Sequence, residues 1–331
     1  MGIVGMPEIS SYWSKSKLYA GSYISSVMTR EKFEILLRCI HFRDNSDVDD
    51  PLDPLFKVRP LVTAIRDCCQ AVYKPGPMVV IDESMVPFRG RSKVRQYIPG
   101  KAHKYGFKLY KVCTPSGYTW NFKIHSGSQT KHQGLNSTES LTVELCEELL
   151  DMGATLYADN YYCSLTLAEY LLKKKTYLCG TLSSTRQYLP KEVTESKKKK
   201  NEMKGRENSN GVKVFKWRDK RNVLTISTVS EHSDQLVPSG KVNRCREEVF
   251  KPQSVMAYNK AKKGVDVFDQ YTSYYSLLRK GKKWYRKLAF ELLTGLTVVN
   301  AWVLHCQYFP RAKMSQLQFR VFIVFPHWRR A

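Results

Sequence analysis

Apolar positions in the first part of the chain recur at helical spacing. Residues 29–41 place apolar side chains three and four positions apart behind Thr29, a residue type that commonly caps helix N-termini, and they predict an amphipathic helix. A second stretch with this spacing covers 57–73 and ends before a Pro-Gly-Pro sequence, which breaks the pattern. We therefore predict an N-terminal helical region over residues 1–77, with dimerisation or DNA binding as its expected role.

Beyond residue 77, short apolar runs replace the helical spacing. Residues 78–81 and 154–158 are typical of buried strands, and the runs 107–113 and 118–124, joined by a Thr-Pro-Ser-Gly turn, predict a β-hairpin. The other elements expected here are helices over 141–150 and 164–174 and a strand over 177–181. Strands that alternate with helices in this order predict an α/β fold, with a mixed sheet flanked by helices, whose first part covers 78–182.

A polar, lysine-rich segment interrupts this order at residues 183–210. Its composition is typical of a flexible loop. Two strand-like runs, 212–217 and 223–228, follow it. We therefore interpret residues 183–253 as a β-containing insertion.

The helical pattern resumes over 255–275, and a long apolar helix is predicted over 284–308. This second helix contains Glu291 and Asn300, which favour a core helix over a membrane span. The last two regions of the chain are therefore 254–310, which carries the final core helices, and 311–331, a tail without a pattern that predicts structure.

The charge balance of the chain indicates the kind of partner that it binds. The 331 residues include 54 Lys and Arg against 30 Asp and Glu, a formal net charge of +24, which attracts polyanions at low salt. Scattered, solvated charge would explain this number as well. Clustering decides between the two interpretations, because the stretch from Arg89 to Lys111 contains eight Lys or Arg and no acid. We therefore favour a nucleic-acid-binding face.

The nine cysteines are scattered and form no Cys-x-x-Cys pair, so the sequence indicates neither a zinc module nor a disulfide framework. A reducing compartment fits this usage. Residues 1–14 lack the layout of a signal peptide. The lysine run within 196–200 resembles a nuclear-import patch, with a solvated loop as the equal alternative. We expect a nuclear location.

Three aspartates carry the candidate chemistry. Asp82 and Asp159 directly follow strand-like runs, where a carboxylate is expected to point into a crevice shared with neighbouring strands, and Asp266 lies in a predicted helix. Three gathered carboxylates are costly unless a divalent cation neutralises them. The simpler roles are a turn-forming acid for Asp82 and a helix N-cap for Asp159. The three residues are too far apart in sequence to form a local motif, so only the fold can bring them together.

Several motifs surround these aspartates in a distinctive order. They are DESMVPFRGR at 82–91, RQYIP at 95–99, KYGFK at 104–108, ADNYY at 158–162 and KGVDVFDQ at 263–270. With these motifs the chain resembles the piggyBac transposase family and proteins derived from it. The resemblance extends upstream to Tyr12-Trp13 and downstream to Trp284.

The resemblance implies an RNase H-like core, interrupted by an insertion, that cleaves DNA and transfers strands in cut-and-paste transposition at TTAA sites. The family's three catalytic acids match Asp82, Asp159 and Asp266, and Asp269 matches a fourth aspartate that assists metal binding. In this DDD-type site two Mg²⁺ ions would activate the attacking oxygen and stabilise the leaving oxygen, with Asp82 bridging both ions.

The basic stretch after Asp82 is the expected DNA-backbone contact, with a lysine-guarded hairpin edge as the alternative. Trp284 either stacks on an unpaired base or is buried at a helix start. The residues expected to contact DNA are Arg89, Arg91, Arg95, Lys101, Lys104, Lys108 and Trp284.

The expected partner is DNA, as transposon ends and TTAA target, with a homodimer as a further option and with neither a membrane nor a small-molecule substrate. Transposases of this family usually have more chain upstream and a C-terminal cysteine-rich zinc module that binds transposon ends, and this chain has no paired cysteines. The alternative function is therefore a domesticated, catalytically idle DNA- or chromatin-binding protein that keeps the scaffold.

Overall fold

The computed structural model describes residues 1–19, 23–46, 50, 52–101, 103–127, 131–242 and 246–325. The chain divides into two compact units whose segments alternate in sequence. Unit 1 consists of Met1–Cys68, Met85–Phe107 and Asp269–Ala331, and unit 2 consists of Cys69–Ser84 and Lys108–Phe268.

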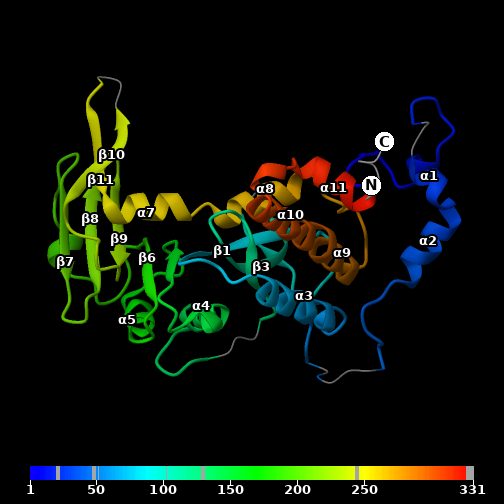
Figure 1. The fold of residues 1–331 in the computed structure, drawn as a ribbon. Coiled ribbons are helices and arrows are strands. Elements are labelled where there is room, and N and C mark those ends of the chain that lie inside the picture. The colour runs from blue at the N-terminus through cyan, green and yellow to red at the C-terminus, as the bar shows by residue number, and fades with distance from the viewer. Residues whose placement is uncertain are drawn as a thin grey trace. The chain divides into compact units, whose positions relative to one another are not determined.

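A mixed β-sheet forms the centre of unit 2 (Figure 1). Its strand order is β3-β1-β5-β6-β9-β8-β7, with β4 paired to β3, and residues 85–87 of β1 and 105–107 of β3 belong to unit 1. The strands are β1 (Met78–Pro87), β3 (Tyr105–Cys113), β4 (Thr119–Ile124), β5 (Thr155–Ala158), β6 (Tyr177–Thr181), β7 (Met203–Glu207), β8 (Lys213–Arg218) and β9 (Asn222–Ser227). β1, β5 and β6 are parallel, whereas β4 pairs antiparallel with β3, and β7, β8 and β9 pair antiparallel with their neighbours. The predicted mixed α/β fold class is confirmed.

The centre of this sheet is buried on both faces, which explains why its strands appear as continuous apolar runs rather than as alternating patterns. The parallel register pairs Ile81 with Ala158 and Ala158 with Gly180. A Cβ on Gly180 would lie 2.1 Å from the carbonyl oxygen of Ala158, so only glycine permits this approach.

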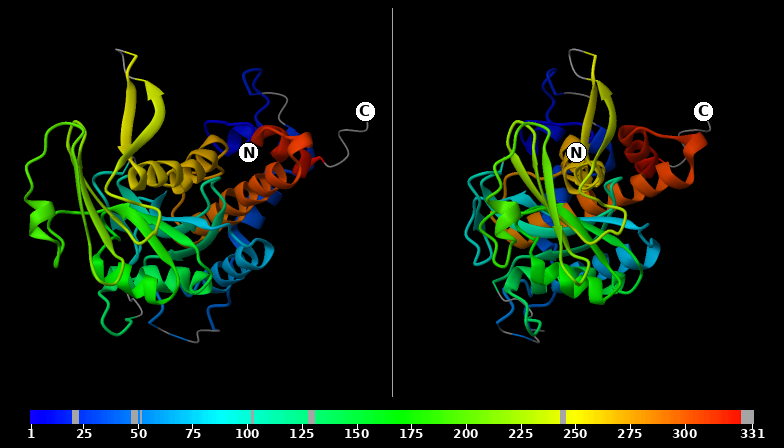
Figure 2. Two further views of the ribbon diagram at one scale, coloured as in Figure 1. Left: turned by 60° about the vertical axis from the view of Figure 1, so that its left-hand side comes forward. Right: turned by 90° about the vertical axis from the view of Figure 1, so that its left-hand side faces the viewer.

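Helices cover both faces of the central strands. On one face, Ala261 of α7 (Gln253–Ala261) packs in a buried cluster with Val80 of β1, Tyr157 of β5 and Cys179 of β6. On the other face lie α4 (Ser137–Cys146), followed by the short turn η2 (Glu147–Leu149), and α5 (Leu165–Lys173) (Figures 1 and 2). The buried cluster fixes α7 across three adjacent strands.

The helical pattern over 255–275 corresponds to two helices, so the prediction of one continuous helix was wrong. α7 ends at Ala261, and α8 (Gly264–Tyr274) begins three residues later. A Cβ on Gly264 would lie 2.5 Å from the carbonyl oxygen of Thr114. Because the chain passes this carbonyl so closely, position 264 requires glycine. The helical run is interrupted just before this residue.

The prediction of a flexible loop over 183–210 was wrong in part. This segment contains α6 (Lys191–Thr194) and β7, which pairs antiparallel with β8. The polar residues of β7 have no apolar periodicity, and they become a strand only because β8 lies beside them. The predicted strands β8 and β9 are present, and β9 pairs with β6, so this segment extends the core sheet. Two further strands, β10 (Leu236–Val242) and β11 (Glu248–Pro252), form a separate antiparallel pair.

Unit 1 is largely helical. The helices predicted over 29–41 and 57–73 are present, and the Thr29 side chain caps the first of them by accepting a hydrogen bond from the backbone N of Lys32. The elements are η1 (Ser10–Trp13), α1 (Tyr23–Val27), α2 (Arg30–Cys39), α3 (Arg59–Val72, which continues into unit 2), β2 (Gln96–Tyr97), the later part of α8, α9 (Trp284–Phe290), α10 (Thr297–Tyr308), η4 (Pro310–Ala312) and α11 (Gln316–Val324). α11 lies in the tail for which the sequence predicted no element, and residues 326–331 of that tail lie outside the described residues.

The long apolar helix predicted over 284–308 is present as α9 and α10, joined by a π-helical segment, Glu291–Leu296. In the described part of the chain this is the one helical run long and apolar enough to cross a membrane by length and composition, and 44% of its most apolar window is buried inside the protein. Leu288, Leu292 and Val299 are fully buried, as in a core helix.

Candidate active site

Asp82 lies on β1, and Asp159 directly follows the adjacent parallel strand β5. The pairing of β1 with β5 ends at the residue before each of them, which places the two aspartates side by side. Side chains of a strand alternate between faces, and Asp82 comes two residues after Val80 while Asp159 comes two residues after Tyr157. Val80 and Tyr157 both pack against α7. Asp82 therefore projects from the face of the sheet that α7 covers, and both carboxylates lie near Tyr258 of α7, whose pKa is raised mainly by burial and further by these two groups.

Asp82 does not end its strand, and the expectation that it does was wrong. Only the pairing with β5 stops at Ile81, whereas β1 itself continues to Pro87 beside β3. The role of a turn-forming acid therefore does not apply. Oδ1 of the half-buried Asp82 accepts a hydrogen bond from the backbone N of Glu83 at 2.7 Å.

Asp159 opens the turn between β5 and α5. Its Oδ1 accepts from the backbone N of Tyr161 at 2.9 Å. The cap of α5 is Ser164, whose side chain accepts from the backbone N of Leu167, so the N-cap role considered for Asp159 is wrong. Asp159 thus belongs to the turn itself, which holds its carboxylate at the end of the strand.

Tyr162 ties this turn to β1. Its buried hydroxyl donates to Oε2 of Glu83 at 3.0 Å, on the residue next to Asp82. Burial, followed by the carboxylates of Glu83 and Asp82, holds the pKa of the Tyr162 phenol far above its usual range, so the hydroxyl keeps its proton and remains a donor. Arg186 holds the same turn by donating to two of its carbonyls, at 2.9 and 2.6 Å.

Tyr162, Glu83 and Arg186 were not expected to shape the site. Side chains alternate along β1, so Glu83 points to the opposite side of the strand from Asp82. The position of Tyr162 inside the Ala-Asp-Asn-Tyr-Tyr motif is the one sequence signal that could have drawn attention to it.

Asp266 lies on the first turn of α8, and the start of this helix packs against β1. A Cβ on Gly264 would lie 3.5 Å from a methyl group of Val80, whose side chain is on the same face as that of Asp82. One turn later, the ammonium group of Lys111 lies 3.8 Å from the ring centre of the buried Phe268. Asp266 is exposed. The start of α8, which carries Asp266, thus lies against β1, while Asp269, half-buried, falls in the part of α8 that belongs to unit 1.

The three aspartates do not form a closed ligand cluster. Among the residues that the structure describes, no group of three or more His, Cys, Asp or Glu side chains lies close enough to hold a metal ion. The carboxylates of Asp82 and Asp159 nevertheless both affect one side chain, that of Tyr258 on α7. Burial is the main cause that raises the pKa of Tyr258 to about 12, and the two carboxylates add to this rise. The donor set fits a hard divalent cation, since carboxylate oxygens are the ligands that Mg²⁺ prefers.

Most of the basic residues expected to contact DNA lie in residues 85–107 of unit 1. There β2 pairs antiparallel with β3, and the Tyr97 and Tyr105 rings lie 4.7 Å apart. Arg95 is partly engaged within this segment, because it donates to two backbone carbonyls at 3.0 Å each and lies 5.5 Å from the Tyr105 ring. The exposed members are Arg89, Arg91, Arg95 and Lys104, and Lys101 is half-buried.

Lys108 and Trp284 have aromatic neighbours. The Lys108 ammonium in unit 2 lies 4.6 Å from the Tyr110 ring and 4.7 Å from the Tyr161 ring. In unit 1, Trp284 is half-buried at the start of α9, and its ring centre lies 6.1 Å from that of Phe107. This contact supports a packing role for Trp284.

The cysteines of the described residues form no disulfide. Burial raises the pKa of Cys146 and Cys179 to about 12 and raises that of Cys163 well above its usual value, so these three remain protonated core thiols. Cys245 lies outside the described residues.

Comparison with known proteins gives consistent matches. A family model described as Transposase IS4 matches residues 1–302. The chain is 28% identical over 328 residues to human PiggyBac transposable element-derived protein 3, covering 93% of this chain and 53% of that protein. It is 27% identical over 344 residues to human PiggyBac transposable element-derived protein 2, covering 97% and 56%. The chain thus spans about half the length of these two human relatives.

The fold is similar to that of a solved protein. A cryo-EM structure of a piggyBac transposase synaptic complex with hairpin DNA matches 98% of this chain and 68% of that chain, with a TM-score of 0.85 and 24% sequence identity. The likeness supports the fold across nearly the whole chain.

Proposed function

This chain belongs to the piggyBac-type transposases of the Transposase IS4 family, and from that membership we propose that it cleaves DNA and transfers strands by metal-dependent chemistry at three aspartates. The observation that carries the proposal is the position of Asp82 on β1 beside Asp159 at the end of the adjacent parallel strand, with α8, which carries Asp266, packed against β1. Three carboxylates gathered from these positions would form a site for a divalent cation.

The proposed metal is Mg²⁺, which when bound activates the attacking oxygen and stabilises the leaving oxygen at a phosphodiester. Asp82, Asp159 and Asp266 would hold it, and Asp269 would assist. Backbone N–H groups orient Asp82 and Asp159 by donating to one oxygen of each carboxylate. The hydroxyl of Tyr162 keeps the two segments that carry these aspartates in register.

The substrate that we propose is DNA, as transposon ends and TTAA target sites. The charge of +24 supports a polyanionic substrate, and the family resemblance supports the target sequence. The exposed Arg89, Arg91 and Lys104 would contact the backbone without reading its sequence. We also propose a nuclear location, supported by this substrate and by the lysine run at 197–200.

A second function, DNA binding without cleavage, is favoured by one observation. Within the described residues, the aspartates are not close enough to hold a metal ion as they stand. A domesticated protein would keep the scaffold and its basic surface while losing the need for a closed ligand cluster.

The test is Mg²⁺-dependent nicking of DNA that carries TTAA beside candidate transposon ends. Asp159→Asn should abolish nicking, because it removes a negative charge from the proposed metal site at nearly constant shape. Asp151→Asn is the matched control in unit 2, since Asp151 is exposed in a turn at φ 62°, a conformation that asparagine tolerates. Equal nicking by the wild type and Asp159→Asn would refute the catalytic proposal, and wild-type DNA binding without any nicking would favour the second function.

The DNA contacts have a separate test in binding alone. Arg91→Gln combined with Lys104→Gln should make the dependence of affinity on salt less steep, by about 1 in the logarithmic slope for each phosphate that the protein no longer neutralises. Fluorescence anisotropy of a labelled duplex over a range of KCl concentrations measures this slope. A slope that is unchanged in the variant would remove these two residues from the interface.

A further inference from the structure

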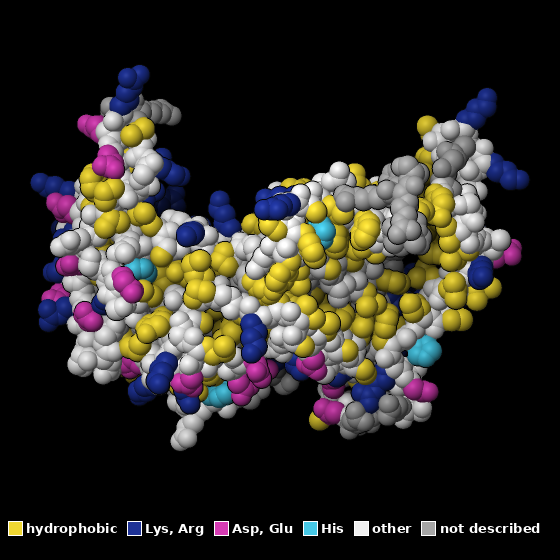
Figure 3. Space-filling model, in the orientation of Figure 1, with side chains coloured by type: hydrophobic (Ala, Val, Ile, Leu, Met, Phe, Trp, Pro, Cys, Tyr) yellow, Lys and Arg dark blue, Asp and Glu magenta, His cyan; other side chains and the backbone are white. Residues whose placement is uncertain are grey.

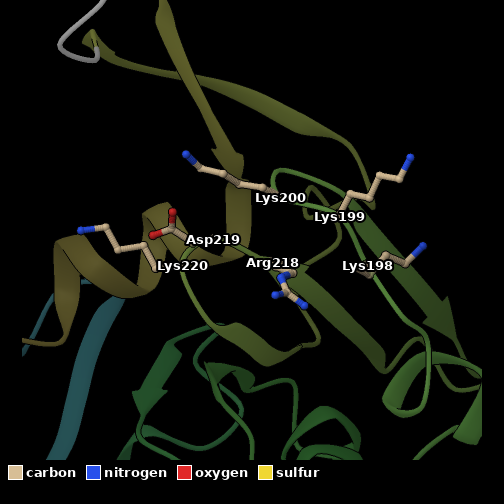
Figure 4. Close-up of a pocket in the computed structure, with 6 residues that line it drawn as sticks. All are labelled: Lys198, Lys199, Lys200, Arg218, Asp219 and Lys220. Atoms are coloured by element: carbon tan, nitrogen blue, oxygen red, sulfur yellow. The ribbon is translucent and has the colours of Figure 1, made fainter.

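A cationic surface lies at one end of strands β7, β8 and β9 in unit 2 (Figure 4). Five basic residues and Asp219 line an open hollow of about 650 Å³ there. In Figure 3, the part of unit 2 that these strands form carries both Lys and Arg and Asp and Glu side chains on the face in view. We call the five basic residues the β7–β9 cationic surface: Lys198, Lys199, Lys200, Arg218 and Lys220.

Two chain connections are held together to build this surface. The backbone N of Asn201 donates to the carbonyl of Arg218 at 2.7 Å, and the backbone N of Arg218 donates to the carbonyl of Glu202 at 3.1 Å. The lysine run therefore lies against the β8–β9 turn. The buried ammonium of Lys216 donates to the carbonyls of two residues that precede the run, at 2.6 and 2.8 Å. This anchor on β8 fixes the point at which the run begins.

The charges of this surface are not cancelled by neighbouring acids. The ion pairs found within the described residues include none of the five cations. Glu202, which follows the lysine run, uses its carboxylate to accept from the backbone N of Lys199 at 2.9 Å. Four of the five cations are exposed, and Lys198 is half-buried. The surface therefore presents five basic side chains, with the carboxylates of Glu202 and Asp219 as acidic neighbours.

The directions of the side chains indicate the kind of partner. Figure 4 shows Lys198 and Lys199 extending to one side of the hollow and Lys200 and Lys220 extending to the opposite side, with Arg218 between the two pairs. Diverging cations do not enclose a single small anion. They fit a polyanion whose charges are spaced along its length, as in a DNA strand with one phosphate about every 3.4 Å. The hollow has no aromatic lining residue on which a base would stack.

We propose that the β7–β9 cationic surface binds the sugar-phosphate backbone of duplex DNA, in addition to the contacts expected from residues 89–108. The choice of DNA over another polyanion rests on the proposed function of the chain. Contacts of this kind position a duplex and contribute affinity without reading its sequence. An acidic protein segment is the competing partner that the experiment separates.

The experiment compares two triple variants of the full chain that remove the same charge. Lys198→Gln/Lys199→Gln/Lys200→Gln removes the run, and Lys173→Gln/Lys174→Gln/Lys175→Gln removes three exposed lysines at the end of α5 in the same unit. Binding to a labelled 30-base-pair duplex of mixed sequence is measured by anisotropy in EDTA, at KCl concentrations from 50 to 200 mM. The first variant should lower the logarithmic salt slope by about 1 for each phosphate left unneutralised, and so by up to about 3, whereas the second should match the wild type.

A second variant tests whether the two connections form one surface. Arg218→Gln/Lys220→Gln should also lower the salt slope, because these residues line the same hollow. All variants should melt at the wild-type temperature, since the substituted side chains lie outside the core. Equal slopes for the 198–200 variant and its 173–175 control would overturn the proposal. If the salt slope falls only in the 198–200 variant, and Arg218→Gln/Lys220→Gln has the wild-type slope, the two connections do not form one binding surface.

The competing partner is tested with a poly-glutamate peptide of 20 residues as a competitor. Loss of peptide binding in the 198–200 variant, with duplex binding intact, would replace DNA by an acidic protein segment and overturn the proposal. Because binding is measured in EDTA, it is independent of cleavage. If the chain binds duplex DNA through this surface but does not nick DNA, the binding proposal stands and the catalytic proposal is refuted. If it nicks DNA but the 198–200 variant and its control have equal salt slopes, the catalytic proposal stands and the binding proposal is refuted.

Discussion

The start of α8 offers the sharpest test of how the fold positions Asp266. Gly264→Ala places a Cβ 2.5 Å from the carbonyl oxygen of Thr114, and real Cβ contacts essentially never fall under 3.0 Å, so the gap must open by about half an ångström. Overpacking of this kind costs about 1–3 kcal/mol. Alanine returns at most about 1 kcal/mol through its higher helix propensity, and less at the first residue of a helix. We therefore expect a net loss of about 1–2 kcal/mol.

Differential scanning calorimetry measures this loss as a fall in melting temperature of about 2–8 °C, because each kcal/mol lowers the melting temperature of a unit of this size by about 2–4 °C. The same movement shifts Asp266 relative to Val80 and the strand that carries Asp82, so Mg²⁺-dependent nicking should fall with it. Gly76→Ala is the matched control in unit 2, since no atom lies within 4 Å of a Cβ built on Gly76. If Gly264→Ala melts at the same temperature as Gly76→Ala, the close packing of α8 on the Thr114 carbonyl is refuted.

Two further predictions concern buried polar groups of unit 2. Tyr162→Phe removes the hydroxyl that donates to Glu83 and should lower the free energy of unfolding by about 1 kcal/mol, whereas Tyr170→Phe on α5 should change it by less than about 0.5 kcal/mol. Guanidinium titration measures both, and equal values would show that the Tyr162 hydroxyl contributes nothing. Burial lowers the pKa of His232 below 6.5, so the stability that its neutral ring contributes is present above pH 6.5 and is lost as the pH falls through the lowered folded-state pKa. Urea midpoints from pH 8 to pH 5 should fall less in His232→Gln than in the wild type, and parallel curves would contradict this assignment.

The central sheet could be predicted from sequence because its strands are short and apolar throughout. Residues 154–158 and 177–181 correspond to β5 and β6 within one residue at each end. The length of β1 could not be predicted in this way, since its second half contains Asp82 and Glu83 and becomes a strand through pairing with β3. The break between α7 and α8 depends on one carbonyl from a distant turn, that of Thr114. Such contacts leave no periodic signal in the chain.

The candidate site was predictable to a similar degree. Motifs predicted Asp82, Asp159 and Asp266, and the fold places the first two side by side and the third at the start of a helix that packs against β1. The hydrogen bond between Tyr162 and Glu83 was not predictable, because it forms only where the fold places β1 and the turn after β5 together. The β7–β9 cationic surface was hidden for the same reason. Its lysine run was visible in the sequence, but the neighbouring Arg218 comes from another connection.

The pairing of β9 with β6 has a consequence for solubility. β6 is apolar and would present open hydrogen-bonding groups to other molecules if it were the outermost strand, and exposed edges of that kind promote aggregation. Strand addition moves the rim outward to β7, which is five residues long and carries Lys204 and Arg206. Short, charged rims resist intermolecular strand pairing. Residues 183–253 therefore protect the edge of the parallel strands from pairing with other molecules. A chain shortened by deleting them should self-associate even if its remaining residues fold.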